Sequence, residues 1–292
     1  MKKASNRKQL FENVVYGVFL LLGLVTIACV LVITVYLVIA GIPGIQKIGV
    51  GKFLFGRVWA STATNPSYGI LPFILTSVYG TAGAIIIGVP IGFMTAVYLS
   101  KFAGRRFKGI MENAINMLAS IPSVVYGLVG MLILVPGVRK LFNLSDGASL
   151  FSAIIVLAIM VLPSIIKVSI TSLEAVPKDY EDASLALGAT PVETYFRVSV
   201  PAAKSGIASA VVLGVGRAIG EAMAVMMVSG NAPNMPSIFE SVRFLTTAVA
   251  SEMSYSSGLQ QQALFSIALV LFLFIMLINA VLNFLLKRNK YC

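Results

Sequence analysis

The chain contains no histidine, only two cysteines and one tryptophan among its 292 residues. The lack of histidine excludes Ser-His-Asp triads, histidine acid–base catalysis and His-ligated metal sites. Cys29 lies in an apolar run and Cys292 is the last residue, so we expect neither a disulfide framework nor a cysteine metal site. The sequence therefore predicts no catalytic residues, no metal and no cofactor in this chain.

Charged residues are also scarce. They make up 11% of the chain, against 58% hydrophobic residues, which is more apolar surface than one soluble core can bury. The charge-poor stretches are long enough for bilayer-crossing helices of about 20 residues, and the first is too long for a signal peptide, so we expect it to be retained. They predict an all-α membrane protein with six transmembrane helices, at about 14–41, 70–100, 111–137, 150–172, 205–230 and 262–286.

The basic residues are divided unequally between the two sides that six spans create. Fourteen lie on the side of the two termini and six lie on the other side. By the positive-inside rule, both termini are expected in the cytoplasm of a bacterial-type cell membrane. The net charge of +11 is then explained by this basic rim meeting anionic lipid headgroups, and no nucleic acid partner is expected.

Glycine and proline recur inside the apolar runs. Gly88 and Gly92, and likewise Gly216 and Gly220, have the small-xxx-small spacing that lets membrane helices approach closely. Five prolines predict kinked or interrupted helices, which are tolerated where neighbouring helices or a cavity satisfy the freed carbonyls. They are Pro72, Pro90, Pro122, Pro136 and Pro163. This pattern favours a bundle that forms a pathway over a simple anchor.

The stretch GVGRAIGEAM at 214–223 places Arg217 and Glu221 four residues apart inside an apolar span. This i, i+4 spacing predicts that they lie on one helix face and can pair, which lowers the cost of charge in lipid. One interpretation is an ion pair that only orients the bundle. The other is that both residues face a translocation path, where the Arg217 guanidinium binds a tetrahedral oxyanion while Glu221 positions and partly neutralises it.

Hydroxyl side chains are further candidates for lining such a path. Each of them is individually more typical of ordinary helix packing. They are Thr76, Ser77, Thr81, Ser120, Ser123 and Tyr126.

The segment EAVPKDYEDASLALGATPVETYFRVSVPAAKSGI lies between the fourth and fifth spans. It predicts a short helix from about Asp179 to Leu187 that ends at Gly188, a usual C-terminal glycine stop. The acidic residues of this helix disfavour a position on anionic headgroups. They favour docking to a protein partner.

The same loop resembles that of the membrane subunits of ABC importers, whose pattern is E-A-A, a glycine, and then I-x-L-P. Asp182, Ala183 and Ser184 stand for E-A-A, and Gly188 is the glycine. After the same nine residues, VSVP at 198–201 stands for I-x-L-P and ends in Pro201. The substitutions are conservative and the spacing is intact.

Three further segments make the resemblance more specific. YGILPFILTSVYGT at 68–81, SIPSVVYGL at 120–128 and GVGRAIGEAMAV at 214–225 are similar, together with EDASLALGAT at 181–190, to PstC-type permeases of phosphate importers. A single motif of this kind is weak evidence. Four in the right order identify the chain as similar to this permease family.

The resemblance implies a type I ABC importer permease fold. It also implies that the chain moves phosphate across the bilayer and has no enzymatic activity of its own. The implied partners are a second related permease, two ATP-binding subunits and an extracytoplasmic phosphate-binding protein. Asp182, Ala183, Ser184, Gly188 and Pro201 would couple transport to the ATPase.

The implied organisation divides the chain into four segments. They are a cytoplasmic N-terminal segment at 1–13, the first transmembrane helix with an outer loop at 14–69, a permease core at 70–286 with a coupling loop at about 173–204, and a cytoplasmic tail at 287–292.

Other function classes remain open at this stage. A permease for another oxyanion, such as molybdate or sulfate, would use the same residues. A secondary anion transporter would also need a buried arginine but not the cytoplasmic loop, and no inverted repeat is apparent. A membrane enzyme or a purely structural scaffold is the least favoured class, because no nucleophile–base set or metal cluster is present in the sequence.

Overall fold

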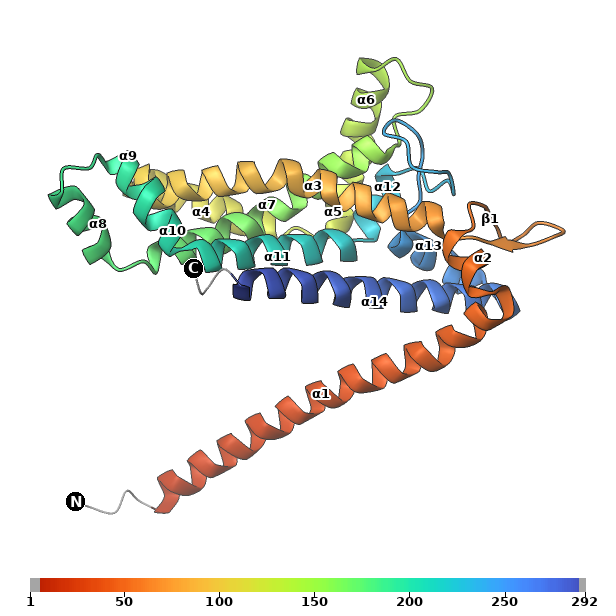
Figure 1. Ribbon diagram of the computed structural model, residues 1–292, viewed down its shortest axis with the longest axis horizontal. Helices are drawn as coiled ribbons and strands as arrows, with labels where there is room; N and C mark the ends of the chain where they lie inside the picture. Colours follow the sequence, from red (N-terminus) through yellow and green to blue (C-terminus); the bar gives the residue numbers. More distant parts are fainter. Residues whose placement is uncertain (1–5, 289–292) are drawn as a thin grey trace.

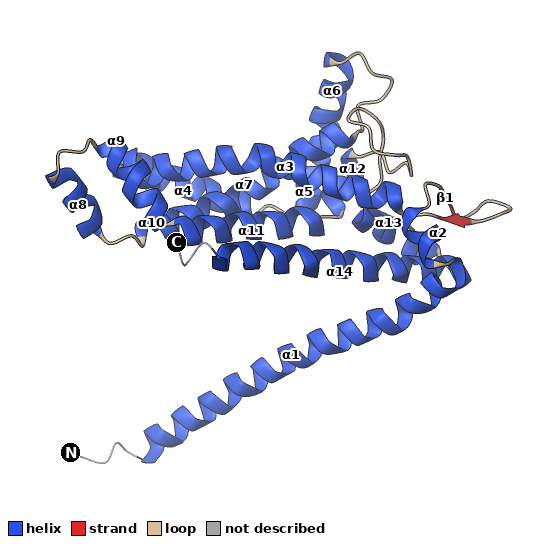
Figure 2. Cartoon of the chain, viewed as in Figure 1, coloured by secondary structure: helices blue, strands red, loops and turns tan. Residues whose placement is uncertain are grey.

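The computed structural model describes residues 6–288. Helices make up nearly all of this part of the chain, and the named strands, β1 (Trp59–Ala60) and β2 (Ser67–Tyr68), form one short antiparallel hairpin (Figure 2). The all-α prediction is confirmed. The first five residues of the expected N-terminal segment and 289–292 of the expected tail, with Cys292, lie outside the described residues.

Five stretches of residues 6–288 are long and apolar enough to cross a membrane, and a bent helix pair brings the number to six. The long helices are α1 (Asn6–Ile48), α3 (Leu71–Val97), α7 (Leu150–Glu174), α11 (Lys204–Gly220) and α14 (Gly258–Arg288). The shorter helices are α2 (Val50–Phe55), α4 (Arg105–Ser120), α5 (Ser123–Val129), α6 (Val135–Leu141), α8 (Lys178–Ala186), α9 (Pro191–Thr194), α10 (Val200–Ala202), α12 (Met223–Val228) and α13 (Leu245–Glu252).

The helices α3, α7, α11 and α14 run together along the long axis of the molecule (Figure 1). One end of this bundle carries α8, α9 and α10, and we call it the α8 end. The opposite end carries α2, the β1–β2 hairpin and α13, and we call it the α13 end (Figure 1). α1 joins the bundle at the α13 end and diverges from it toward the N-terminus, so most of its apolar surface is exposed.

Three of the predicted spans differ from the helices observed. The first helix is longer than the predicted 14–41, because it begins at Asn6 and continues through Pro43 to Ile48. The predicted helix at 111–137 is interrupted between Ser120 and Ser123, and the predicted helix at 205–230 ends at Gly220. The first break agrees with the interrupted helix that Pro122 predicts, whereas the prediction of a helix continuing to residue 230 is wrong.

Small residues bring α3 and α7 into close contact. A Cβ atom added to Gly88 would lie 2.8 Å from Val161 Cγ2, and one added to Gly92 would lie 2.9 Å from Ile165 Cγ2. Both distances are too short for a carbon–carbon contact, so only glycine allows these backbones to pack at this separation. The predicted role of this glycine pair is confirmed, and α7 is the most buried of the membrane-crossing helices described.

The second glycine pair does not behave in this way. A Cβ atom added to Gly216 or Gly220 would meet no atom within 4 Å. The prediction that this pair draws helices together is therefore wrong for contacts within the described chain. Gly214, half a turn earlier, contacts α7 instead, where an added Cβ would lie 3.1 Å from Ile165.

Candidate functional site

The break between α11 and α12 lies at Glu221, inside the apolar stretch that contains both charges. α11 ends at Gly220, and the backbone of Glu221 is extended. The Glu221 carboxylate accepts a hydrogen bond of 3.0 Å from the backbone N–H of Ala224, in the first turn of α12. The Thr246 hydroxyl donates to the Glu221 carbonyl oxygen across 2.7 Å. The backbone groups that a broken helix would leave unpaired are in this way satisfied locally.

Arg217 lies in the last turn of α11 and does not pair with Glu221. Its Nη1 atom donates to the hydroxyl of Ser164, on α7, across 3.1 Å. The prediction that the two charges share one helix face is wrong, because the helix ends between them. Each charge instead lies where a helix dipole favours it, the arginine at a C-terminus and the glutamate at an N-terminus.

A second break separates α4 from α5 at Ile121 and Pro122. Proline has no N–H to donate and disfavours the helical conformation in the residue before it, and Ile121 is extended. The Tyr126 hydroxyl donates across the break to the carbonyl oxygen of Leu118, at 2.7 Å. Ser120 donates to the Met117 carbonyl oxygen at 2.8 Å. The interruption that Pro122 predicts is confirmed.

The two breaks lie close together because α5 packs against α12 (Figure 1). A Cβ atom added to Gly127 would lie 2.8 Å from Ala224 Cα, so these two backbones are nearly in contact. Arg217 is also near enough to Tyr126 to interact with it electrostatically. A part-buried arginine, two interrupted helices and the Ser164 and Tyr126 hydroxyl groups therefore lie near one another, and interrupted helices beside a charged group are the arrangement that transporters use to bind ions.

The structure divides the predicted hydroxyl residues into two groups. Ser120, Ser123 and Tyr126 flank the break between α4 and α5, and of these Tyr126 is near enough to Arg217 to interact with it. Ser77 is buried and accepts a hydrogen bond of 3.0 Å from the backbone N–H of Leu245, so it supports the start of α13. Thr76 is also fully buried, and no partner for its hydroxyl is found among residues 6–288.

Two residues of this site, Ser164 and Thr246, are not among the site residues that the sequence predicts. Ser164 lies 53 residues from Arg217, and Thr246 lies 25 residues from Glu221. Serine and threonine are common in membrane helices, so neither position carries a signal that sequence periodicity detects. Only the packing of α7 and α13 against the break reveals them.

The predicted short helix in the loop is α8, and its predicted end at Gly188 is confirmed. Gly188 has φ +86, a left-handed conformation that costs glycine nothing and strains other residues. Its N–H donates to the Leu185 carbonyl at 2.9 Å, and the Ala189 N–H donates to the Ser184 carbonyl at 3.3 Å. These bonds close the helix and turn the chain back toward α9.

α8 is attached to the rest of the chain by polar contacts. Glu181 forms an ion pair with Lys101 and accepts a hydrogen bond of 2.7 Å from Ser199. The hydroxyls of Ser184 and Thr194 are 2.9 Å apart. Partial burial alone would raise the pKa of Glu181, but the hydrogen bonds from Lys101 and Ser199 and the charge of Lys101 outweigh it and hold this pKa below its usual value.

Much of the surface of α8 is exposed, although Tyr180 also lines a pocket with Ser172 of α7 and Gly206 of α11. Asp182 and Ala183 are exposed, as is Pro201 at the start of α10. Tyr180 is 56% exposed and Leu187 is 90% exposed, which is unusual for large apolar side chains outside the lipid. Ser184 differs from its neighbours, because its small hydroxyl side chain fits against Thr194 of the same chain.

A family model described as a binding-protein-dependent transport system inner membrane component matches residues 88–291. The chain belongs to this family of transport proteins. It is 36% identical over 273 residues to the probable ABC transporter permease protein YqgH of Bacillus subtilis, covering 92% of this chain and 88% of that protein. It is 34% identical over 278 residues to the phosphate transport system permease protein PstC of Haemophilus influenzae, covering 88% and 86%.

The fold of this family is also found among solved structures. A chain of a bacterial ABC transporter that imports the polysaccharide alginate aligns with a TM-score of 0.63, at 13% identity, over 96% of this chain and 99% of that chain. A chain of the MetNI methionine ABC transporter aligns with a TM-score of 0.58, at 19% identity, over 75% and 97%. These likenesses confirm the predicted fold, that of an ABC importer permease.

Proposed function

We propose that this chain is the permease subunit of an ATP-driven importer that moves inorganic phosphate from an extracytoplasmic binding protein into the cytoplasm. The PstC relatives support phosphate as the substrate. The observation that carries the proposal is the position of Arg217, a part-buried arginine that binds Ser164 of α7 from the end of α11, beside two interrupted helices. Its planar, permanently charged guanidinium matches a tetrahedral oxyanion.

The site favours passage over tight binding. Ser164 holds one guanidinium nitrogen of Arg217 and leaves the other donors for the anion. Glu221 caps the N-terminus of α12 and so stabilises the break between α11 and α12 beside the arginine. One positive charge with hydroxyl neighbours, rather than a cage of several cations, allows phosphate to enter and to leave again.

The orientation follows from the basic residues at the α8 end. Lys101, Arg105, Arg106 and Lys108, together with Arg197 of the loop, lie on this side, which we assign to the cytoplasm with both termini. The α13 end then faces the extracytoplasmic binding protein. A second permease, related to this one, is expected to complete the path.

Two ATP-binding subunits are the proposed cytoplasmic partners, and α8 is the proposed coupling helix. The exposed side chains of Tyr180 and Leu187 offer an apolar surface to a groove on the ATPase. Asp182, Ala183 and Pro201 are exposed on the same loop, while Gly188 and Ser184 maintain its shape. Because Glu181 and Lys101 join α8 to the end of the α3 span, a movement of the ATPase is transmitted to the membrane helices.

The decisive experiment is uptake of labelled phosphate into vesicles that contain the copurified complex, with the binding protein and ATP supplied. We expect uptake that needs both ATP and the binding protein. An excess of molybdate or sulfate should not compete. Competition by either ion would assign the permease to that oxyanion, and uptake that persists without ATP would favour a secondary transporter.

A further inference from the structure

Lys167 is a charged residue inside the membrane-crossing part of α7, and it has no role in the proposed function. It lies seven residues before the end of the helix at Glu174, which is about 10 Å along the helix axis. It is exposed, and it takes part in none of the ion pairs found among residues 6–288. A lysine at such a depth is expected to face protein or water rather than lipid chains.

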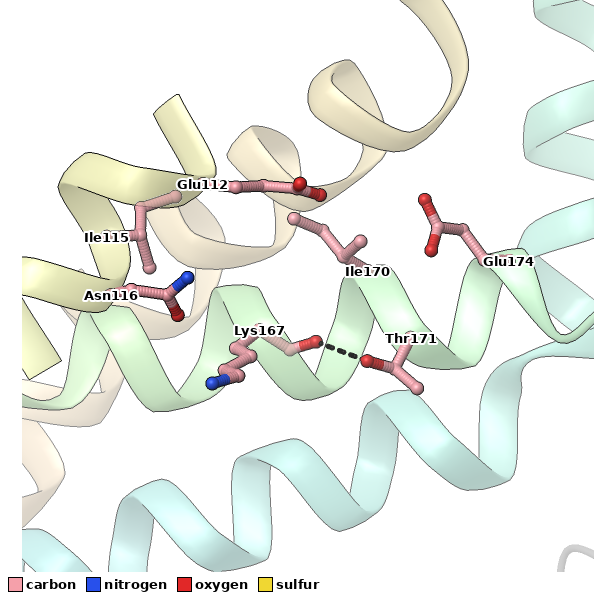
Figure 3. Close-up of a pocket in the computed structure, with 7 residues that line it drawn as sticks. All are labelled: Glu112, Ile115, Asn116, Lys167, Ile170, Thr171 and Glu174. Carbon is pink, nitrogen blue, oxygen red and sulfur yellow. Dashed lines mark hydrogen bonds between the residues drawn. The ribbon is translucent and has the colours of Figure 1, made fainter. Parts of the chain in front are cut away.

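The surroundings of Lys167 are a pocket between α4 and α7, with a volume of about 220 Å³. Its polar lining consists of Glu112, Asn116, Lys167, Thr171 and Glu174. Figure 3 shows the Lys167 amine nearer to Asn116 and the Glu174 carboxylate farther along α7, toward the α8 end. The pocket is large enough for several water molecules or a small hydrated anion.

The two carboxylates of this pocket already have a counter-ion. Lys108, at the start of α4, forms an ion pair with Glu174 and lies 3.9 Å from Glu112. The Thr171 hydroxyl donates to the backbone carbonyl of Lys167 across 3.1 Å, and the ammonium group of Lys167 has no ion pair among residues 6–288. The positive charge without a partner in the pocket is therefore at its deep end.

This charge is aligned with the proposed phosphate site. Ser164, Lys167 and Thr171 are spaced i, i+3 and i+7 along α7, so they lie on the same face of the helix. Ser164 is the residue that binds Arg217. Lys167 is thus about one helical turn, roughly 5 Å, nearer to the α8 end than the contact with Arg217.

We infer that Lys167 is a second anion-binding residue of the path, and that the pocket around it receives phosphate after it leaves Arg217. This inference rests on the proposed function. Phosphate would pass from a guanidinium to an ammonium group one turn farther on, assisted by the Asn116 amide. Beyond Lys167 the two carboxylates of Glu112 and Glu174 face one ammonium group, that of Lys108, so the local net charge is negative and the anion is repelled toward the cytoplasm.

Two substitutions test this role in the assembled complex. In Lys167→Gln the amide keeps a polar side chain but removes the charge, and phosphate uptake should fall about tenfold, the order expected when a charge-assisted hydrogen bond is lost. Lys167→Arg should retain more than half of the uptake. Lys8→Gln, which removes an exposed lysine of α1 outside the pocket, is the matched control and should transport like the wild type. Normal uptake by an assembled Lys167→Gln complex would overturn the inference.

A second measurement does not depend on transport. Thr171→Cys, which keeps Lys167 in the same pocket, should react with a water-soluble thiol reagent applied from the cytoplasmic side in a background with Cys29→Ser and Cys292→Ser, and inorganic phosphate should slow the reaction. An unreactive thiol, or a rate independent of phosphate, would overturn the inference even if the glutamine variant fails to assemble. Absence of phosphate uptake by the wild-type complex would instead overturn the proposed function, and the thiol reaction would still decide whether this pocket receives the anion.

Discussion

The carboxylate of Glu221 accepts a hydrogen bond of 3.0 Å from the backbone N–H of Ala224, three residues farther along the chain. A membrane helix that ends in mid-bundle exposes backbone groups that lipid cannot satisfy. Glu221 supplies the acceptor for the new N-terminus, and Arg217 occupies the preceding C-terminus. The two charges of GVGRAIGEAM are therefore required by the broken helix itself, and only Arg217 remains available to an anion.

This relationship predicts the outcome of exchanging the charges. The double substitution Arg217→Glu with Glu221→Arg should abolish phosphate uptake and also lower the thermal midpoint of unfolding. It removes the acceptor for the Ala224 N–H and places each charge at the helix end that disfavours it, and loss of a helix cap alone costs about 0.5–2 kcal/mol. Uptake into vesicles and thermal unfolding of the purified chain measure the two effects.

Glu221→Gln is the control for the charge swap, since its amide oxygen still accepts the hydrogen bond, and its midpoint should stay near that of the wild type. A swapped variant as stable as the wild type would contradict this explanation.

The glycines of α3 and α11 provide a matched pair of substitutions. Gly88→Leu should destabilise the chain by about 1–3 kcal/mol, because the new side chain meets Val161 at the seam between α3 and α7. Gly216→Leu should have little effect on the isolated chain, because the space beside Gly216 is open. Thermal unfolding in detergent compares the two variants. Equal destabilisation by both would show that the close contact of α3 with α7 is not what Gly88 provides.

The attachment of α8 through Glu181 predicts a dependence on pH. The pKa of Glu181 in the folded chain lies below its ordinary value of 4.5, so its ion pair with Lys101 contributes stability that is present above pH 4.5 and is lost as the pH falls below it. The thermal midpoint of Glu181→Gln should be lower than that of the wild type at pH 7. The difference should shrink as the pH is lowered below 4.5.

Asp182→Asn removes one negative charge at the exposed neighbouring position and serves as the control for Glu181→Gln. A difference that is the same at pH 7 and pH 4 would argue against this ion pair as the attachment.

Features of the chain that depend on neighbours in sequence could be predicted. The apolar runs of α3, α7 and α14 are long enough to indicate membrane-crossing helices without knowledge of their partners. The end of α8 at Gly188 was predictable because a left-handed residue after a short helix favours glycine. Pro122 indicated an interrupted helix for the equally local reason that it cannot continue the backbone hydrogen bonds.

The end of α11 at Gly220 was not predictable in this way. The sequence from 205 to 230 has the composition of one continuous membrane helix, and the spacing of Arg217 and Glu221 matches an ion pair on such a helix. The break becomes stable because Thr246 reaches the freed carbonyl of Glu221 and Ser164 engages Arg217 from α7. These residues are 25 and 53 positions away from their partners, so no local pattern reports them.

The sequence by itself determined that this chain lies in a membrane, which segments cross it, and which permease family its motifs resemble, because hydrophobic length and motif spacing act locally along the chain. Only the tertiary structure decided where α11 ends, which partner Arg217 has, and that the pocket around Lys167 lies one turn farther along α7. These depend on hydrogen bonds and close contacts between helices distant in sequence, and in a bilayer such contacts decide which backbone groups can remain outside a helix.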